Sequence, residues 1–179
     1  MSSLVLMLAT VMAATPQQDA QDSATRQEQL ALQSLAAWGG SSAVVGAVAS
    51  RLSKDPQWQA FHEMNAAWGA VNLTLAGAGL WSASRETSPH KQRERWLNYP
   101  AIFALNAGLD VGYIAAGAWL WKSGEEQADA TKIGRGHAVM LQGGALLIFD
   151  AVMAVRFAKT NREIWLSPHA EGVALVGRF

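Results

Sequence analysis

Four long apolar stretches separated by polar segments dominate the pattern of hydrophobic positions along this chain. We expect them to form helices at Leu30–Leu52, Gln59–Ser82, Asn98–Lys122 and Ile133–Ala158. Each stretch approaches the length of about 20 residues that a helix needs to cross a bilayer, and charged side chains are nearly absent inside it. The predicted fold class is therefore all-α, a four-helix transmembrane bundle.

A water-soluble bundle with long core helices is the alternative interpretation. Its helices would each carry an apolar face opposite a broad polar face, whereas the polar faces here are narrow. Glycine and alanine are spread through the stretches, as is typical of helices that pack closely in lipid. Tryptophans also occur at the edges of the stretches, where interfacial anchors lie: Trp58, Trp81, Trp96, Trp119 and Trp121. These features favour the membrane interpretation.

The remaining segments complete the predicted domain organisation. Residues 1–14 contain the apolar run Leu4–Ala14, which is short for a membrane span and resembles the core of a signal peptide. No Lys or Arg precedes this run, so a removable signal, an anchor, or neither remains open. Residues 15–29 form a polar lead-in that favours a surface helix. Residues 30–158 form the membrane domain, with linkers at Ala83–Leu97 and Ser123–Lys132, and residues 159–179 form an interfacial or irregular tail.

Two features disagree about the orientation in the membrane. Four spans place the amino terminus, the linker Ala83–Leu97 and the tail on one side, together with most of the Lys and Arg residues. The positive-inside rule puts this side in the cytoplasm. A cleaved signal peptide would put it outside.

The composition excludes several function classes. The chain has 14 Lys and Arg residues and 14 Asp and Glu residues, so no excess of positive charge is available to bind nucleic acid. The absence of cysteine excludes disulfides, thiolate metal sites and thiol nucleophiles. A nucleophile elbow, a phosphate loop and a paired His–Glu zinc motif are also absent. We therefore expect no catalytic residues and no cofactor, and a structural or ligand-binding role is favoured over that of an enzyme.

Polar side chains inside the apolar stretches form the main candidate site. Such residues are costly in lipid and usually face the interior of a bundle. Helical spacing places Asn106, Asp110 and Tyr113 on one face of the third stretch, and we place Gln142 and Asp150 on one face of the fourth. The hypothesis assigns ligand binding or a proton relay to Asn65, Asn72, Asn106, Asp110, Tyr113, Gln142 and Asp150.

Depth along the helices predicts which of these residues meet. At about 1.5 Å per residue, antiparallel spans bring certain polar positions to matching heights in the bilayer. The predicted pairs are Asn72 with Asp110, Asn106 with Asp150, and Tyr113 with Gln142.

Three roles remain open for these polar groups. Interhelical hydrogen bonds can simply hold the helices in register. Alternatively, because no Lys or Arg lies at the depth of Asp110 or Asp150, the protonated acids are favoured there and can handle protons or a small solute. A weaker hypothesis uses His62 and His137, which lie at one depth and would bind a metal, haem or quinone with Glu63.

Three segments resemble an uncharacterised family of small bacterial membrane proteins, a domain of unknown function. They are FHEMNAAWGAVNL from Phe61, NAGLDVGYI from Asn106 and LQGGALLIFD from Leu141. The resemblance spans Ala37–Phe157 and implies a compact helical protein without assigning an activity. We expect a location in the bacterial inner membrane, with the lipid bilayer and either a second copy or another membrane subunit as partners.

Overall fold

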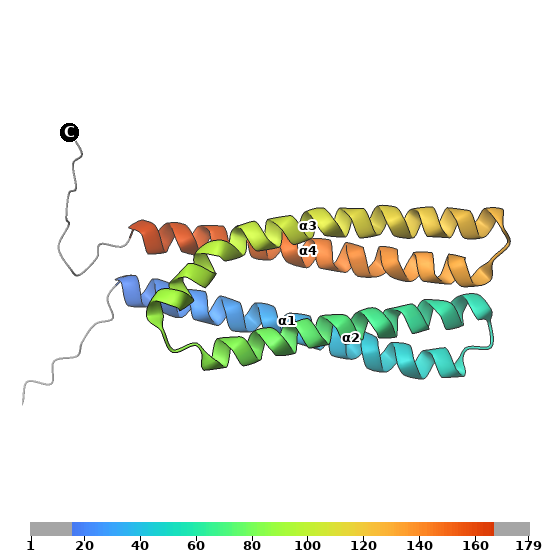
Figure 1. The fold of residues 1–179 in the computed structure, drawn as a ribbon, viewed down its shortest axis with the longest axis horizontal. Coiled ribbons are helices and arrows are strands. Elements are labelled where there is room, and N and C mark those ends of the chain that lie inside the picture. Colours follow the sequence, from blue (N-terminus) through green and yellow to red (C-terminus); the bar gives the residue numbers. More distant parts are fainter. Residues whose placement is uncertain (1–15, 167–179) are drawn as a thin grey trace, which may run out of the picture.

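The computed structural model describes residues 16–166, which form four long antiparallel helices (Figure 1). In chain order they are α1 (Pro16–Leu52), α2 (Pro56–Arg85), α3 (Pro89–Glu126) and α4 (Ala130–Leu166). These described residues contain no strand, and the predicted all-α four-helix fold is confirmed. The signal-like run Leu4–Ala14 lies outside the described residues, as do residues 167–179.

The helices pair into two hairpins, α1 with α2 and α3 with α4 (Figure 1). Contacts between α2 and α4 join the hairpins, and α1 adds a smaller contact with α4. The backbones of α2 and α3 do not approach each other closely anywhere along their lengths. Because α3 packs mainly against α4, much of its circumference remains uncovered.

The helices begin earlier or end later than the apolar pattern predicts. The predicted linker Ala83–Leu97 is largely helical, since α2 continues to Arg85 and α3 already begins at Pro89. Proline suits a first helical position because its φ angle is preset and its missing N–H would have no partner there. At the other end, α4 continues past Ala158 to Leu166, into residues that were expected to form an irregular tail.

Pro100 lies inside α3, and a side chain of α4 compensates for it. Proline has no N–H to donate to the carbonyl of Trp96 one turn earlier. The side-chain Nδ2 of Asn161 donates to this carbonyl at 3.1 Å and to that of Leu97 at 3.2 Å. A tertiary hydrogen bond therefore replaces the missing helical one, and α3 continues through a residue that often ends helices.

Backbone contact holds each hairpin together. A Cβ atom added to Gly69 in α2 would lie 2.3 Å from the backbone nitrogen of Ala43 in α1. A Cβ atom on Gly136 in α4 would lie 2.5 Å from the backbone nitrogen of Trp121 in α3. Only residues without a side chain permit such close approach, as the spread of glycine through the apolar stretches suggested.

The described part of the chain is apolar outside and partly polar inside. Of the four predicted spans, only those in α3 and α4 are long and apolar enough to cross a membrane by length and composition, and only 11% and 33% of their apolar windows are buried. Large apolar side chains project outward from all four helices, among them Val44, Val48, Leu75, Ile102, Leu105, Val111, Ile148 and Val155. The buried residues are alanines, a few large apolar groups and several amides and carboxyls.

Candidate functional site

The side chain of Gln142 in α4 is the centre of a hydrogen-bonded group in the middle of the bundle. Its Oε1 accepts from Trp38 Nε1 at 2.9 Å and from Asn72 Nδ2 at 3.5 Å. Its Nε2 donates to Asn65 Oδ1 at 2.8 Å and to Ser42 Oγ at 3.3 Å. We call these five residues the amide cluster. The cluster links α1, α2 and α4, and it uses both acceptor positions and both donors of the central amide.

Asp110 of α3 and Asp150 of α4 form a second group, the carboxyl pair. Both residues line one cavity with Asn106, the two carboxyl groups lie within hydrogen-bonding reach of each other, and the Asn106 side chain lies within such reach of Asp150. Two carboxyl groups can form a hydrogen bond with each other only when one of them carries a proton. Oδ2 of Asp110 is buried and has no hydrogen-bond partner in the described part of the chain.

The carboxyl pair lies at the floor of a cleft between α2 and α3, with a volume of about 210 Å³. The rings of Trp68 in α2 and Tyr113 in α3 meet across it at a centroid distance of 5.0 Å. Three apolar residues of its lining, Val71, Leu75 and Leu109, are 49%, 60% and 52% exposed. The cleft therefore opens onto the apolar exterior of the bundle.

One of the three predicted depth pairs is confirmed, namely Asn106 with Asp150. Asn72 and Asp110 both line the cleft, but the Asn72 amide donates to Gln142 instead. The pair Tyr113 with Gln142 is wrong, since Tyr113 packs on Trp68 and Gln142 bonds residues of α1 and α2.

The wrong pair follows from the rotation of α4. The positions of Gln142 and Asp150 differ by about 80° around a helix axis, so they are not on one face as expected. Gln142 faces α1 and α2, whereas Asp150 faces α3. The predicted candidate site is thereby split into the amide cluster and the carboxyl pair. Only Asn72 belongs to the amide cluster and also lines the cleft of the carboxyl pair.

Comparison with known proteins identifies the family of this chain. Residues 34–151 match the family of unknown function DUF6992. The chain belongs to DUF6992. No curated protein and no solved structure matches the chain. The DUF6992 match includes the amide cluster, the carboxyl pair and every residue of the cleft.

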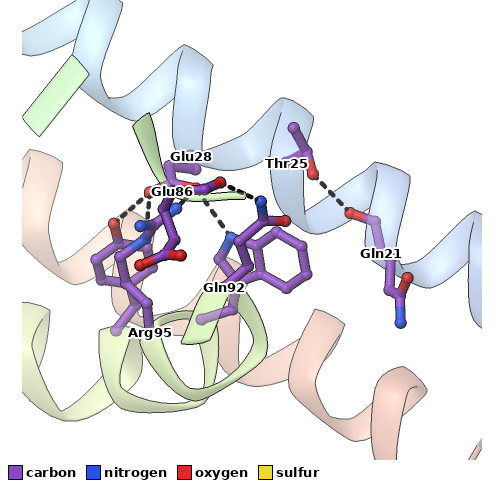
Figure 2. Close-up of polar contacts among 8 residues, drawn as sticks. Gln21, Thr25, Glu28, Glu86, Gln92 and Arg95 are labelled. Atoms are coloured by element: carbon purple, nitrogen blue, oxygen red, sulfur yellow. Dashed lines mark hydrogen bonds and ion pairs between the residues drawn. The ribbon is translucent and has the colours of Figure 1, made fainter. Parts of the chain in front are cut away.

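A third polar group lies at one end of the bundle, and sequence reasoning missed it (Figure 2). Glu28 of α1 precedes the DUF6992 match and is 4% exposed. Its carboxylate lies 2.8 Å from Arg95 Nε and accepts from Arg95 Nη2 at 3.1 Å. It also accepts from Trp96 Nε1 at 2.9 Å and from Tyr99 Oη at 2.6 Å. The charge is thus paired with a guanidinium and both oxygens have donors.

The sequence does contain a signal for this Glu28 group. Glu28 continues the helical spacing of Ala20, Ala24 and Ala31, all of which are buried on one face of α1. An acid at a position in such a stripe must be paired when the stripe packs. The signal was overlooked because residues 15–29 were interpreted as a solvated lead-in.

The expected anchoring tryptophans divide into two kinds. Trp58, Trp81 and Trp119 are exposed, as interfacial anchors would be. Trp96 is only 3% exposed and donates its indole N–H to Glu28, so its interpretation as an anchor is wrong. Trp121 packs on the ring of His137.

The two histidines of the weaker hypothesis contact different parts of the bundle. His62 stacks on Trp58 of its own helix and lines a cavity with residues of α1, whereas His137 packs on Trp121 of α3. Within residues 16–166, no group of three or more His, Cys, Asp or Glu side chains is placed to hold a metal ion.

Proposed function

We propose that this DUF6992 protein is an integral membrane protein of four spanning helices whose carboxyl pair binds a small ligand or a proton. The distribution of polarity supports the membrane location. The apolar windows of α3 and α4 lie mostly on the outside of the bundle, whereas a water-soluble protein rarely exposes large contiguous apolar surfaces. Lipid would cover this surface and leave amides and carboxyls to pair with one another inside.

The unpartnered Asp110 oxygen at the floor of the cleft is the observation that carries the binding role. A buried polar atom without a partner costs about 1–3 kcal/mol, so such an atom is stable where a ligand or a proton supplies the partner. The cleft also opens where lipid would lie, which gives an apolar ligand a path to it. Its volume of about 210 Å³ lies below the ~300–1,000 Å³ of sites for drug-sized molecules and indicates a small ligand.

A purely structural role is the second candidate, and the amide cluster favours it. Gln142 has a partner for each donor and acceptor of its side chain, which leaves nothing for a ligand to add. Such a group aligns three helices at one height. The two candidates differ in whether the carboxyl pair is accessible from lipid.

Two measurements test the proposal. Alkaline carbonate should leave the expressed protein in the membrane fraction. Dicyclohexylcarbodiimide, a lipophilic reagent for protonated carboxylic acids, should then modify Asp110 or Asp150, as mapped by peptide mass spectrometry. A water-soluble carbodiimide should instead modify exposed acids such as Glu63.

Each measurement has an outcome against the proposal. Release of the protein by carbonate would contradict the membrane location. Retention in the membrane without modification of either aspartate would contradict an accessible cleft and would leave the structural role as the better explanation.

A further inference from the structure

We infer that the ligand of the cleft is a small lipophilic cation, such as a substituted ammonium, that exchanges with a proton of the carboxyl pair. This inference rests on the proposed function of the cleft and specifies its ligand. Three properties of the cleft carry it, namely its charge, its aromatic lining and the place where it opens.

The carboxyl pair is the only source of charge in the cleft lining among the described residues. Asp110 shares the cleft lining with Leu35 from α1, Asn72 from α2, Asn106 and Tyr113 from α3, and Asp150 from α4. None of these is basic, so a pair holding one proton keeps a negative charge that nothing nearby neutralises. Such a charge is costly in a buried site, and a second proton or a bound cation would remove the cost.

Aromatic rings line the same cleft as the carboxyl pair. The lining contains the edge-to-face pair Trp68 and Tyr113, and a second such pair formed by Phe103 and Phe149 at 6.0 Å and 78°. Ring faces attract cations, and aromatic cages are the usual recognition sites for quaternary ammonium groups. An anion would be repelled by the carboxyl pair, and a neutral ligand would leave its charge uncompensated.

The position of the cleft opening favours a ligand that is soluble in lipid. The exposed residues of its lining are apolar on both α2 and α3, so a hydrated metal ion would have to shed its water at an apolar surface. An organic cation with apolar substituents can arrive from the bilayer and bury those substituents against the walls.

Cation and proton would compete for the same oxygens. The doubly protonated pair is neutral; when an ammonium binds, one proton leaves and the pair becomes a monoanion beside the cation. No covalent bond to carbon changes, and the net charge of the occupied site stays at zero. Where the free pair is doubly protonated, affinity for the cation should therefore fall about tenfold for each unit by which pH is lowered.

A matched pair of probes tests the inference on the full chain in lipid nanodiscs. Benzyltrimethylammonium carries the charge, and neopentylbenzene has the same shape with carbon in place of the nitrogen. We expect the ammonium to protect Asp110 and Asp150 from dicyclohexylcarbodiimide, and the uncharged isostere to need at least a tenfold higher concentration. Calorimetric titration with the ammonium should also show the proton release and the pH dependence.

Variants locate the binding site. Asp110→Asn and Asp150→Asn should each weaken ammonium binding at least tenfold, whereas Glu63→Gln, which changes an exposed acid of α2 outside the cleft, should leave it unchanged. If the aspartate variants fail to fold, Trp68→Leu serves instead. It should lower ammonium affinity severalfold while leaving carbodiimide modification of the carboxyl pair intact.

The outcomes separate this inference from the proposed function. Equal protection by both probes, affinity independent of pH, or no protection while the carbodiimide still reacts would overturn the cation and keep the cleft as a binding site. If the carbodiimide modifies neither aspartate, both the cation inference and the proposed binding function of the cleft are overturned.

Discussion

The amide cluster and the carboxyl pair are two polar regions of one apolar bundle, and they differ in how completely they are satisfied. Gln142 is 1% exposed and has four hydrogen-bond partners from two other helices. Asp110 is 3% exposed, and its Oδ2 has no hydrogen-bond partner in the described part of the chain. The two regions therefore do not differ in burial. They differ because the carboxyl pair combines an unpartnered buried oxygen with a place in the lining of a cleft.

The Glu28 group extends this comparison to a charged residue. Its carboxylate is buried like Asp110 but has Arg95, Trp96 and Tyr99 around it. By the same criterion it belongs with the amide cluster, as a group that positions α1 against α3. The following changes test this division, from the largest expected effect on stability to the smallest.

Removing Glu28 should have the largest effect on stability. Glu28→Leu leaves the Arg95 guanidinium without its partner in a site that is mostly buried, which costs roughly 3–5 kcal/mol of unfolding free energy. The midpoint of thermal unfolding in detergent would report it. The double variant Glu28→Leu, Arg95→Leu should recover much of the loss, and no recovery would show that the ion pair is not what the single variant disturbs.

Replacing Gln142 should have the next largest effect. Gln142→Leu removes four interhelical hydrogen bonds at about 0.6 kcal/mol each, so a loss of roughly 2–3 kcal/mol is expected. Carbodiimide modification of the carboxyl pair should persist in the folded variant. A variant as stable as the original chain would contradict the structural role of the amide cluster.

Replacing Asn161 should have a smaller effect. Asn161→Leu should lower the unfolding free energy by about 1 kcal/mol, because it leaves the Trp96 carbonyl without a donor. The cost should shrink in a Pro100→Ala background, where residue 100 regains an N–H for that carbonyl. A double-mutant cycle of unfolding free energies measures this coupling. Equal costs in both backgrounds would contradict the compensation.

Replacing Asp110 should have the smallest effect on stability and the largest on function. Asp110→Asn supplies an amide donor to Asp150 without a second acid, so the unfolding free energy should change by less than about 1 kcal/mol. Carbodiimide modification of Asp110 is necessarily lost, and ligand protection of Asp150 should be lost with it. A large destabilisation would place the carboxyl pair with the structural groups.

Part of the candidate site could be predicted from residue spacing. Asn106 and Asp150 were matched by depth alone, because the rise per residue of two antiparallel helices is constant. The pair Tyr113 with Gln142 could not be predicted by the same argument. Depth gives height in the bundle but not the direction in which a side chain points, and Gln142 points to α1 and α2.

The helix ends show the same limit. Residues Ala83–Leu97 were interpreted as a linker because they carry four basic residues between two apolar stretches. In the structure α3 already begins at Pro89 and continues through Pro100, since Asn161 from a distant part of the chain bonds the carbonyl that this proline leaves free. Helix propensity depends on residues that are close in the sequence, so it cannot include a hydrogen-bond partner as distant as Asn161.

The sequence by itself determined the all-α class, the four apolar stretches and five of the polar residues buried among them (Asn65, Asn72, Asp110, Gln142 and Asp150), because these depend on length and hydropathy. Only the tertiary structure decided which polar groups are saturated and which are not. That decision depends on how α4 is rotated between its neighbours: one side meets the amides of α2, and the other meets Asp110 beside the gap that α2 and α3 leave open. A hydrogen bond needs direction as well as height, and direction is a property of the packed bundle.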